Sequence, residues 1–534
     1  MKSLRGAVIW SAAVLLITFL GYFLFPGHTY LQSDTQIYIP MLERLHNPAL
    51  FTGDIVVLRP HLTFTVYDDT ALAFKRITHA DFESILTAEQ LLFRALAVVG
   101  LILIALRLGL TSMQAFFVAA VVSLGATISG PAVLTIEYEP VPRGFAISLI
   151  VFALGLIAEE HFLAAGAAAA VAFLYHPPTT LPFWGLAILL VILKRVRWTI
   201  LAPLAIAAAV LAILARIEPP GAETSHIFRR LDPWEENLQR MRAAYSFVST
   251  WAVYHRVNYA VQTTIAAVAF WRLRKFIHPP LRDFLIGLPI IGILSIPFSW
   301  LMLENQHWAL IPQWQPARAI LFVSLIAALL AAASAMKAPN FAERSFWLTI
   351  AFLMPMQHAF LGRAIHWQPL LLAAPLAILT TVLCLFRKET LILAALIPFF
   401  AMPRLVENYA HNETPDLRSL AAWARTSTPE PSLFVFPDSK TALDPGIFRA
   451  RSLRGLYVDW KSGGQVNYFP AFAEEWWKRW QQVNKLHDLT GADYLVTKKP
   501  IPNATQLFAN PTYFVYRACG AGPCPAVTSS PDSR

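Results

Sequence analysis

The sequence predicts an α-helical polytopic membrane protein with about thirteen transmembrane helices, followed by a C-terminal α/β module outside the membrane. Three observations predict this class. Apolar residues make up 56% of the 534 residues, charged residues make up 14%, and the mean hydropathy is +0.50. Apolar runs recur up to about residue 405. From His411 onward the composition is that of a soluble domain. This combination is typical of a multipass membrane protein with one soluble module.

The apolar runs define the predicted transmembrane domain, residues 1-405. The first run is too long for a typical signal peptide and no convincing cleavage site follows, so it is predicted to be a retained helix. A helix needs about twenty apolar residues to cross a bilayer, fewer where the membrane is thin. The predicted spans lie near 7-25, 90-108, 113-135, 144-158, 161-175, 180-194, 198-215, 257-271, 284-303, 318-336, 345-360, 368-386 and 389-403.

Basic residues in the short loops predict the orientation, because cytoplasmic loops are rich in Lys and Arg. With the N-terminus inside, the inner loops include KRVR at 194-197 and RLRK at 272-275. The long first loop, 26-89, and the C-terminal module then lie outside. We therefore expect a multipass protein of the inner (plasma) membrane with a cytoplasmic N-terminus and a periplasmic or otherwise extracytoplasmic C-terminal domain. The formal charge of +10 is explained by orientation and contact with membrane lipid, with no nucleic acid partner.

Residues 406-534 are predicted to form the soluble α/β domain. PDLRSLAAWART and FAEEWWKRWQQVNKL have helical patterns, whereas SLFVFPD, ADYLVTKK and YFVYRA have strand patterns. The second helix places Phe472, Trp476, Trp480 and Val483 on one face, which we expect to pack on the sheet or the membrane surface. Whether Cys519 and Cys524 form a disulfide is left open, because that depends on an oxidising compartment.

Polar residues gather between the spans on the outer side. With the predicted boundaries, no Asp, Glu, Lys or Arg lies in the middle of a span, which disfavours an ion-coupled transporter. The outer segments are instead dense in polar residues and proline: SDTQIY, LFTGD, EYEPVPRG, YHPPTT, ENQHWALIPQWQPAR and LGRAIHWQP. Irregular backbone at membrane depth is tolerated where it lines a cavity. We therefore expect a polar cavity that opens outward, roofed by the first loop and the C-terminal module.

This organisation resembles the GT-C superfamily of membrane glycosyltransferases. The resemblance rests on the helix number, an acidic residue in the first external loop soon after helix one, and an external C-terminal α/β module. WARTSTPEPSLFVFPD and FRARSLRGLYVDWK are also similar to the tails of bacterial GT-C-like proteins. The resemblance implies transfer of a sugar from a polyprenyl-phosphate-linked donor to a glycan, lipid or protein acceptor. The first loop has no DxD pair and the tail no WWD motif, so no cofactor is assigned and a divalent metal ion is left open.

Asp34 is the candidate catalytic residue, because the resemblance places the first-loop acid at this position. A carboxylate near the anomeric carbon can accept the proton of the acceptor and stabilise an oxocarbenium-like transition state. The alternative is that Asp34 caps the helix that begins TQIYIPMLERL. Asp54, in LFTGD, is a candidate substrate-binding residue, although aspartate is also common at Gly-Asp turns for backbone reasons.

Five further residues are candidates for substrate binding: Glu137, Glu139, Arg143, His176 and Arg318. A carboxylate between spans three and four can bind sugar hydroxyls while Arg143 faces phosphate; the alternative is an interfacial ion pair. Arg318 suits bidentate recognition of a phosphate, but it can also snorkel to the lipid headgroups. Single histidines such as His176 are more often structural, and no spacing of the HExxH kind indicates zinc.

Two other classes of function stay open. A non-catalytic GT-C-like protein that binds lipid or glycan, or that assembles envelope components, keeps the same fold without the chemistry. A transporter or flippase is disfavoured by the spans that lack ionisable residues.

Overall fold

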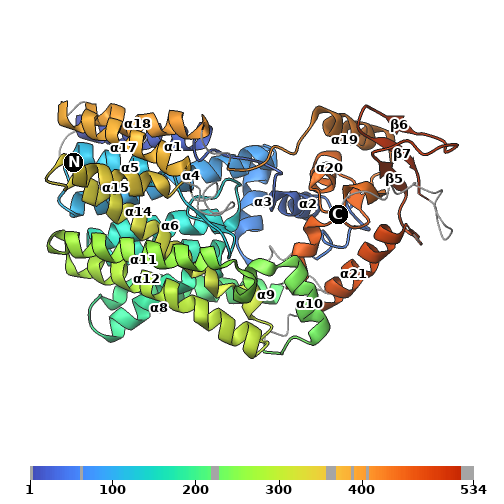
Figure 1. Ribbon diagram of the computed structural model, residues 1–534. Helices are drawn as coiled ribbons and strands as arrows, with labels where there is room; N and C mark the ends of the chain where they lie inside the picture. Colours follow the sequence, from blue (N-terminus) through green and yellow to red (C-terminus); the bar gives the residue numbers. More distant parts are fainter. Residues whose placement is uncertain are drawn as a thin grey trace.

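A computed structural model describes residues 4–59, 64–217, 228–356, 368–386, 390–404, 408–486 and 488–518. It consists of a bundle of apolar helices and a smaller part that contains the main β-sheet (Figure 1). The N-terminus lies at one end of the bundle, and the C-terminal module covers the opposite end. Helices α2 and α3 of the first loop lie between the bundle and the module.

Each predicted span overlaps one helix of the bundle. The bundle helices are α1 (Leu4–Phe23), α4 (Phe82–Arg107), α5 (Ser112–Val122), α6 (Pro142–Ala158), α7 (Phe162–Tyr175), α8 (Pro177–Ile192), α9 (Ala202–Ile217), α11 (Val253–Leu273), α12 (Pro279–Ser299), α14 (Leu321–Met336), α15 (Phe341–Leu353), α17 (Gln368–Phe386) and α18 (Thr390–Ala401). Between them lie α2 (Thr35–His46), α3 (Tyr67–Thr78), α10 (Pro233–Arg242) and α13 (Ile311–Trp314).

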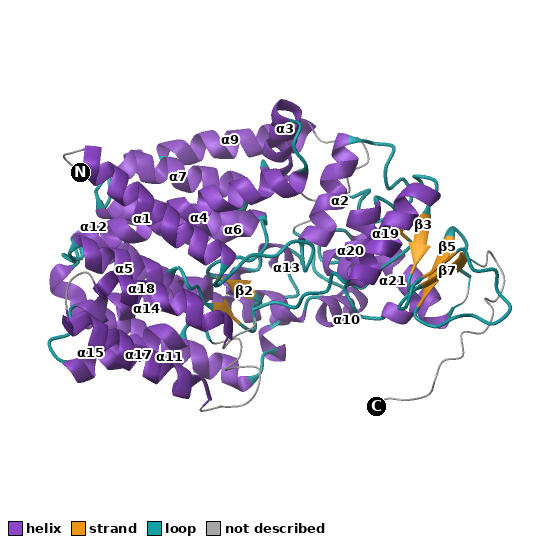
Figure 2. Cartoon of the chain, turned by 90° about the horizontal axis from the view of Figure 1, so that it is seen from above, coloured by secondary structure: helices purple, strands orange, loops and turns teal. Residues whose placement is uncertain are grey.

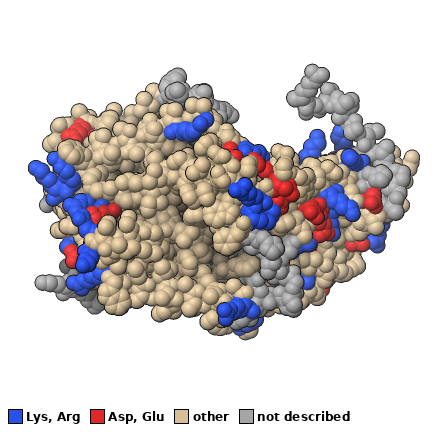
Figure 3. All heavy atoms as spheres, turned by 90° about the horizontal axis from the view of Figure 1, so that it is seen from below, with Lys and Arg blue, Asp and Glu red and all other residues tan. Residues whose placement is uncertain are grey.

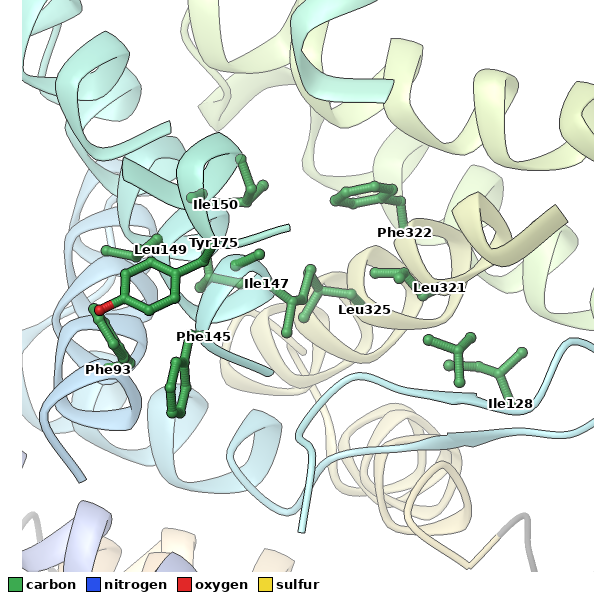
Figure 4. Close-up of a cluster of buried hydrophobic side chains, with 14 of the residues drawn as sticks. Phe93, Ile128, Phe145, Ile147, Leu149, Ile150, Tyr175, Leu321, Phe322 and Leu325 are labelled. Atoms are coloured by element: carbon green, nitrogen blue, oxygen red, sulfur yellow. The ribbon is translucent and has the colours of Figure 1, made fainter. Parts of the chain in front are cut away.

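The core of the bundle is built around α14, which is buried along its whole length. Figure 4 shows Leu321, Phe322 and Leu325 of α14 in one buried cluster with side chains of α4 and α6. Helices α4 and α6 cross in backbone contact at Gly100 and Gly155, where any side chain would collide with the facing helix. Small residues at such a crossing allow the close packing that holds helices together in lipid.

Five helical segments of the described residues are long and apolar enough to cross a membrane: Gly6–Phe23, Phe82–Arg107, Trp198–Arg216, Pro279–Asn305 and Ile311–Met336. Several other bundle helices are apolar but shorter. Figure 3 shows Lys and Arg gathered at the end of the bundle that holds the N-terminus and again over the module, with a mostly uncharged belt between them. These features are those of a membrane protein, whereas the number of crossings, about thirteen, stays a prediction.

The predicted inner loops meet at one end of the bundle. Arg107, at the end of α4, pairs with Glu160 after α6 at 3.4 Å, and Arg195, after α8, pairs with Asp283 in the first turns of α12 at 2.9 Å. The ammonium group of Lys337 donates to the carbonyl of Gly109 at 2.7 Å. The loops that carry the basic signal therefore share one end, opposite the module. Which side of a membrane this end faces stays a prediction.

Three details of the sequence prediction are wrong. The span predicted at 113-135 is only the helix α5, which ends at Val122; strands β1 (Thr127–Ile128) and β2 (Val133–Leu134) follow as an antiparallel hairpin. The span predicted at 90-108 begins at Phe82, so the first external loop ends earlier than residue 89. Finally, Arg94 lies within α4, where its buried guanidinium donates to three backbone carbonyls, so not every span lacks a charged residue.

The C-terminal module is a five-stranded mixed sheet with three helices (Figure 2). Its elements are α19 (Pro415–Ser427), β3 (Leu433–Val435), α20 (Asp444–Ser452), β4 (Gly455–Leu456), α21 (Pro470–Lys485), β5 (Tyr494–Thr497), β6 (Phe508–Ala509) and β7 (Phe514–Arg517). Strand β3 pairs in parallel with β4 and β5, and β7 runs antiparallel to β5 and β6. The predicted helices α19 and α21 and strands β3, β5 and β7 are confirmed, whereas α20 was not predicted.

The module packs on the first loop through α20 and α2. Arg449 of α20 is fully buried and donates to the backbone carbonyl of Gln36 in α2 at 2.9 Å. The same guanidinium contacts Asp54 at 3.5 Å and Asp459 at 3.3 Å. Asp34 directly precedes α2. The packing of α20 on α2 therefore fixes the position of Asp34 relative to the module.

Candidate functional site

Asp34 occupies the N-cap position of α2, yet its side chain makes no capping hydrogen bond. Its Oδ1 instead accepts a hydrogen bond from Nζ of Lys461, 2.7 Å away in the C-terminal module. Its Oδ2 lies 3.7 Å from the guanidinium of Arg143, at the start of α6. The carboxylate therefore faces cationic groups from two distant parts of the chain, and the predicted capping role is wrong.

Glu139 fixes the backbone around Asp34. The Glu139 carboxylate is buried and accepts hydrogen bonds from the backbone N–H groups of Gln32, Ser33 and Thr35 at 2.8, 2.7 and 3.0 Å. It also accepts one from the hydroxyl of Thr35 at 2.9 Å. With four donors around it, Glu139 holds the 32–35 turn in place, and this role differs from the sugar binding that the sequence indicates.

Arg143 links the site to the loop before α6. Its Nε donates to Oε1 of Glu137 at 2.6 Å, and both side chains are largely buried. Burial alone raises the pKa of the Asp34 carboxyl, but attraction to Lys461, Arg143 and Arg318 outweighs burial and holds that pKa well below its usual range. Asp34 is therefore an ionised and weakly basic carboxylate in this arrangement.

Two cavities lie near the start of α2. The first has a volume of about 540 Å³, and its wall includes the polar residues Gln32, Asp34, Arg143 and Asn412. We call it the polar cavity. The second has a volume of about 480 Å³, and its wall includes Tyr38 and Tyr468. We call it the aromatic cavity. Tyr38 lies one turn after Asp34 on α2, so the start of this helix forms part of the wall between the two cavities.

The aromatic cavity continues into an apolar groove on the side of the bundle. The groove has a volume of about 290 Å³ and runs between α8 and α12. It shares Leu181 and Trp314 with the aromatic cavity. Leu294 and Phe298 of α12 line the groove and are exposed on the bundle surface. An exposed apolar groove on a membrane helix bundle is a surface that lipid chains can occupy.

Arg318 lies next to this cluster, just before α14. Its Nε donates to the carbonyl of Pro131 at 3.1 Å, and its guanidinium lies 5.0 Å from the ring centre of Tyr245. The positive charge of Arg318 helps to lower the pKa of Asp34. Among the described residues, no carboxylate forms an ion pair with Arg318. The structure therefore brings Arg318 together with Asp34 and Arg143, whereas its role in phosphate binding stays a prediction.

The remaining two candidates have other partners. Asp54 is buried where the first loop meets the module, and it accepts hydrogen bonds from the backbone N–H groups of Val56 and Leu456 at 3.2 and 2.9 Å. It does not join the site, so its predicted role in substrate binding is replaced by a structural one. His176 lines the aromatic cavity, but its Nδ1 caps α8 by accepting from the N–H of Thr179 at 3.2 Å.

Sequence reasoning missed Lys461, Tyr38, Tyr245 and Tyr468. The three tyrosines lie close enough to Arg318, Asp34 or each other to interact electrostatically. Tyr38 was discoverable, because it lies four residues after Asp34 on a predicted helix. Lys461 was not, since VDWKSGG carries no spacing that relates it to the first loop.

A metal site was left open by the sequence. Among the described residues, no group of three or more His, Cys, Asp and Glu side chains could hold a metal ion. A divalent metal ion stays an untested prediction. Residues 357–367, which include most of the outer segment LGRAIHWQP, and the Cys519–Cys524 pair lie outside the described residues.

A family model described as a domain of unknown function (DUF6798) matches residues 415–483, within the module. No curated protein matches the sequence. Solved structures similar to the chain include arabinofuranosyltransferase AftD from Mycobacteria, with 13% identity and a TM-score of 0.47 over 98% of this chain. The chain spans only 40% of the length of AftD.

Two other similar structures are complexes. ArnT from Cupriavidus metallidurans, bound to undecaprenyl phosphate, has 12% identity and a TM-score of 0.46, covering 98% of this chain and 100% of ArnT. The archaeal oligosaccharyltransferase AglB from Archaeoglobus fulgidus, in complex with an inhibitory peptide and a dolichol-phosphate, has 10% identity and a TM-score of 0.38, covering 93% of this chain and 70% of AglB.

Proposed function

We propose that this chain is a membrane glycosyltransferase that moves a sugar from a polyprenyl-phosphate-linked donor to an acceptor on the extracytoplasmic side. The observation that carries the proposal is the position of Asp34. Its carboxylate lines the polar cavity together with Arg143, and Tyr38, one turn later on α2, lines the aromatic cavity that continues into the apolar groove. A lipid-linked sugar has a hydrocarbon chain at one end and a polar sugar phosphate at the other. It therefore needs an apolar surface next to a polar one.

The donor is assigned to the aromatic cavity and the apolar groove. Its prenyl chain lies along Leu294 and Phe298, where apolar contact replaces contact with lipid. Its sugar lies among the tyrosines Tyr38 and Tyr468, whose ring faces pack well against the C–H faces of a sugar. Its phosphate reaches toward Arg143, whose planar guanidinium can bind phosphate oxygens in a bidentate manner.

The acceptor is assigned to the polar cavity. Side chains that can exchange hydrogen bonds with hydroxyl groups line it, including Gln32, Ser33 and Asn412. In transfer, the acceptor oxygen attacks the anomeric carbon while its proton passes to Asp34. The bond from that carbon to the phosphate oxygen breaks, and cationic groups stabilise the charge on the departing phosphate. In this proposal the cavities and the module lie on the extracytoplasmic side of the inner membrane.

The proposal is tested by reconstitution of the full chain in lipid nanodiscs with radiolabelled undecaprenyl-phosphate hexoses and pentoses. The measured quantities are sugar transfer to envelope extracts and release of free sugar from the donor. We expect turnover of at least one donor, and a loss of about 10²- to 10⁴-fold in Asp34→Asn. Lys478→Ala, an exposed change on α21, is the matched control and keeps the parent rate. Equal rates for Asp34→Asn and the parent would rule out the role of Asp34.

One observation favours a second candidate, a non-catalytic protein that binds lipid or glycan. The Asp34 carboxylate is already neutralised by Lys461 at 2.7 Å, and a carboxylate held in this way is a poor base. Such a protein would bind undecaprenyl phosphate or its glycosides without turnover. In the reconstitution this result appears as retained donor with no transferred or released sugar from any of the donors.

A further inference from the structure

Lys461 is the one cation of the described site that the C-terminal module supplies directly to Asp34. Its ammonium group donates to Oδ1 of Asp34 at 2.7 Å and to the hydroxyl of Ser33 at 3.0 Å. Both acceptors belong to the wall of the polar cavity. The side chain is neither sealed in protein nor free in solvent, since 20% of its surface is exposed. A ligand in the cavity can therefore reach the same ammonium group.

The backbone that carries Lys461 is firmly held. Its neighbour Trp460 lies beneath the guanidinium of Arg242, at 3.4 Å from the ring centre. On the other side, the N–H of Ser462 donates to Asp459 at 3.2 Å, and Asp459 is itself paired with the buried Arg449. The lysine stem is the flexible part, because it has four rotatable carbons and a compact charge. Lys461 can change partners by rotation of its side chain, with no movement of the module.

The cations around Asp34 have few anionic partners of their own. Arg143, Arg318 and Lys461 all lie close enough to Asp34 to lower its pKa, and Arg143 also pairs with Glu137. Among the described residues, no carboxylate forms an ion pair with Arg318, and the nearby Glu139 accepts from backbone N–H groups instead. Partly buried charge of one sign attracts a counter-ion strongly, because solvent screens it less than on an open surface. A phosphodiester carries a single negative charge and can pair with these cations.

We infer that Lys461 is a phosphate-binding residue that leaves Asp34 for the phosphate of the lipid-linked donor, so that donor binding releases Asp34 to act as a base. This inference rests on the proposed function and adds to it a residue and an order of events. The module then acts as part of the active site, and the contact between Lys461 and Asp34 is the resting state of the pair.

The change of partner keeps the charge of Lys461 paired throughout transfer. With the donor bound, the ammonium group of Lys461 faces the phosphodiester and Asp34 is free to accept a proton. The acceptor O–H gives its proton to Asp34, the acceptor oxygen bonds to the anomeric carbon, and the bond from that carbon to the phosphate oxygen breaks. The electron pair stays on the phosphate, which becomes a monoester with one more negative charge. Lys461 and Arg143 are placed to stabilise that charge.

The experiment measures binding of undecaprenyl phosphate, as the probe, to the full chain in nanodiscs by native mass spectrometry. We expect Lys461→Ala to weaken binding about tenfold or more, because a charge-assisted hydrogen bond is lost. Lys461→Arg keeps the charge and restores most of the affinity, and Lys478→Ala binds like the parent. Thermal unfolding of each variant confirms that the module stays folded, and Lys461→Arg serves where Lys461→Ala does not fold.

The second arm uses Asp34→Asn, which removes the resting partner of Lys461. The exchange predicts that this variant binds undecaprenyl phosphate more tightly than the parent, by about threefold or more, since the phosphate no longer competes with a carboxylate. The gain disappears when Lys461→Ala is combined with it. A lysine that only fastens the module to the first loop would give no gain in Asp34→Asn.

The binding measurements distinguish three outcomes. Tighter binding in Asp34→Asn that depends on Lys461 supports the exchange. Equal binding by Lys461→Ala and the parent, or an Asp34→Asn gain that survives without Lys461, overturns the exchange and leaves the proposed function standing. A parent chain that binds no undecaprenyl phosphate overturns the proposed function, and the exchange falls with it.

Discussion

Two aspartates of the first loop each contact a basic residue of the C-terminal module. The two pairs differ in burial, in the flexibility of the cation and in the other partners of the carboxylate. Asp54 contacts Arg449 where both side chains are sealed, with 2% and 0% of their surfaces exposed. Asp34 contacts Lys461 at the edge of a cavity, with 30% and 20% exposed. The first pair joins a rigid planar cation to a carboxylate that backbone N–H groups also hold. The second joins a flexible cation to a carboxylate that faces open space.

The difference in burial separates a structural ion pair from one that is available for the proposed reaction. A sealed pair cannot meet a substrate, but breaking it leaves a buried charge without a partner, which is costly. A partly exposed pair adds less to stability, because solvent also stabilises both charges. Its groups are available for exchange. We therefore assign Asp54 and Arg449 to docking of the module, and Asp34 and Lys461 to the proposed reaction.

The largest expected effect tests this division through stability. Arg449→Met leaves the buried Asp54 and Asp459 carboxylates without their cation, and we expect a loss of about 3–5 kcal/mol in the free energy of unfolding. Lys461→Met, matched in chemistry, should cost about 1 kcal/mol or less. Thermal unfolding followed by tryptophan fluorescence, together with limited proteolysis of the module, measures both. If the two variants lose equal stability, the two pairs do not differ in role.

The second prediction concerns Glu139, which holds the turn that presents Asp34. Glu139→Gln keeps the shape of the side chain but replaces one acceptor oxygen by a donor, which opposes the N–H groups of Gln32, Ser33 and Thr35. We expect a loss of about 1–3 kcal/mol. Hydrogen exchange at residues 32–35 should accelerate, with no change at residues 54–57. Unchanged protection of the 32–35 turn would show that Glu139 does not position Asp34.

The helices were predictable because long apolar runs without charges have few alternatives in a membrane. The hairpin after α5 was not predictable. Its residues Thr127–Leu134 are mostly apolar, so the sequence pattern does not show where the helix ends. Gly125 and Gly130, with φ of 77° and 76°, mark its turns, but glycine is also frequent inside membrane helices. Composition alone does not separate these two uses of glycine.

The site was predictable where its residues lie close in the chain or at helix ends on one side. Glu137, Glu139 and Arg143 were found in this way, and the structure places all three beside Asp34. Their individual roles were not predictable, because Glu139 binds backbone groups of a turn more than 100 residues away. Lys461 lies 427 residues from Asp34, and only docking of the module on α2 brings the two together.

The third prediction extends the comparison to His176, a candidate that the structure places in a cavity and also in a helix cap. His176→Ala removes the acceptor for the N–H of Thr179, and we expect a loss of about 0.5–2 kcal/mol in stability. His176→Asn retains a capping oxygen and should recover most of this loss. A role in substrate binding would give a different result: an increase in donor KM that His176→Asn does not repair. Measuring unfolding and KM on both variants separates the two.

The smallest expected effect is the pH dependence of the Asp34–Lys461 pair. An aspartate in an unfolded chain has a pKa of about 3.9. The pKa of Asp34 in the folded protein lies below that value, because Lys461, Arg143 and Arg318 together outweigh the effect of burial. As the pH falls, the unfolded chain binds the proton first, so the contribution of the pair to stability is complete above about pH 5 and is lost progressively below that value, as the pH falls toward the folded pKa. The difference in unfolding temperature between the parent and Asp34→Asn should thus be constant from about pH 8 to about pH 5 and shrink below that range. In Lys461→Met the pKa of Asp34 rises toward its unfolded value, so both the contribution of Asp34 to stability and its decrease on acidification should be smaller. A difference that widens on acidification would mean that Asp34 gains a proton on folding, and the resting contact with Lys461 would have to be abandoned.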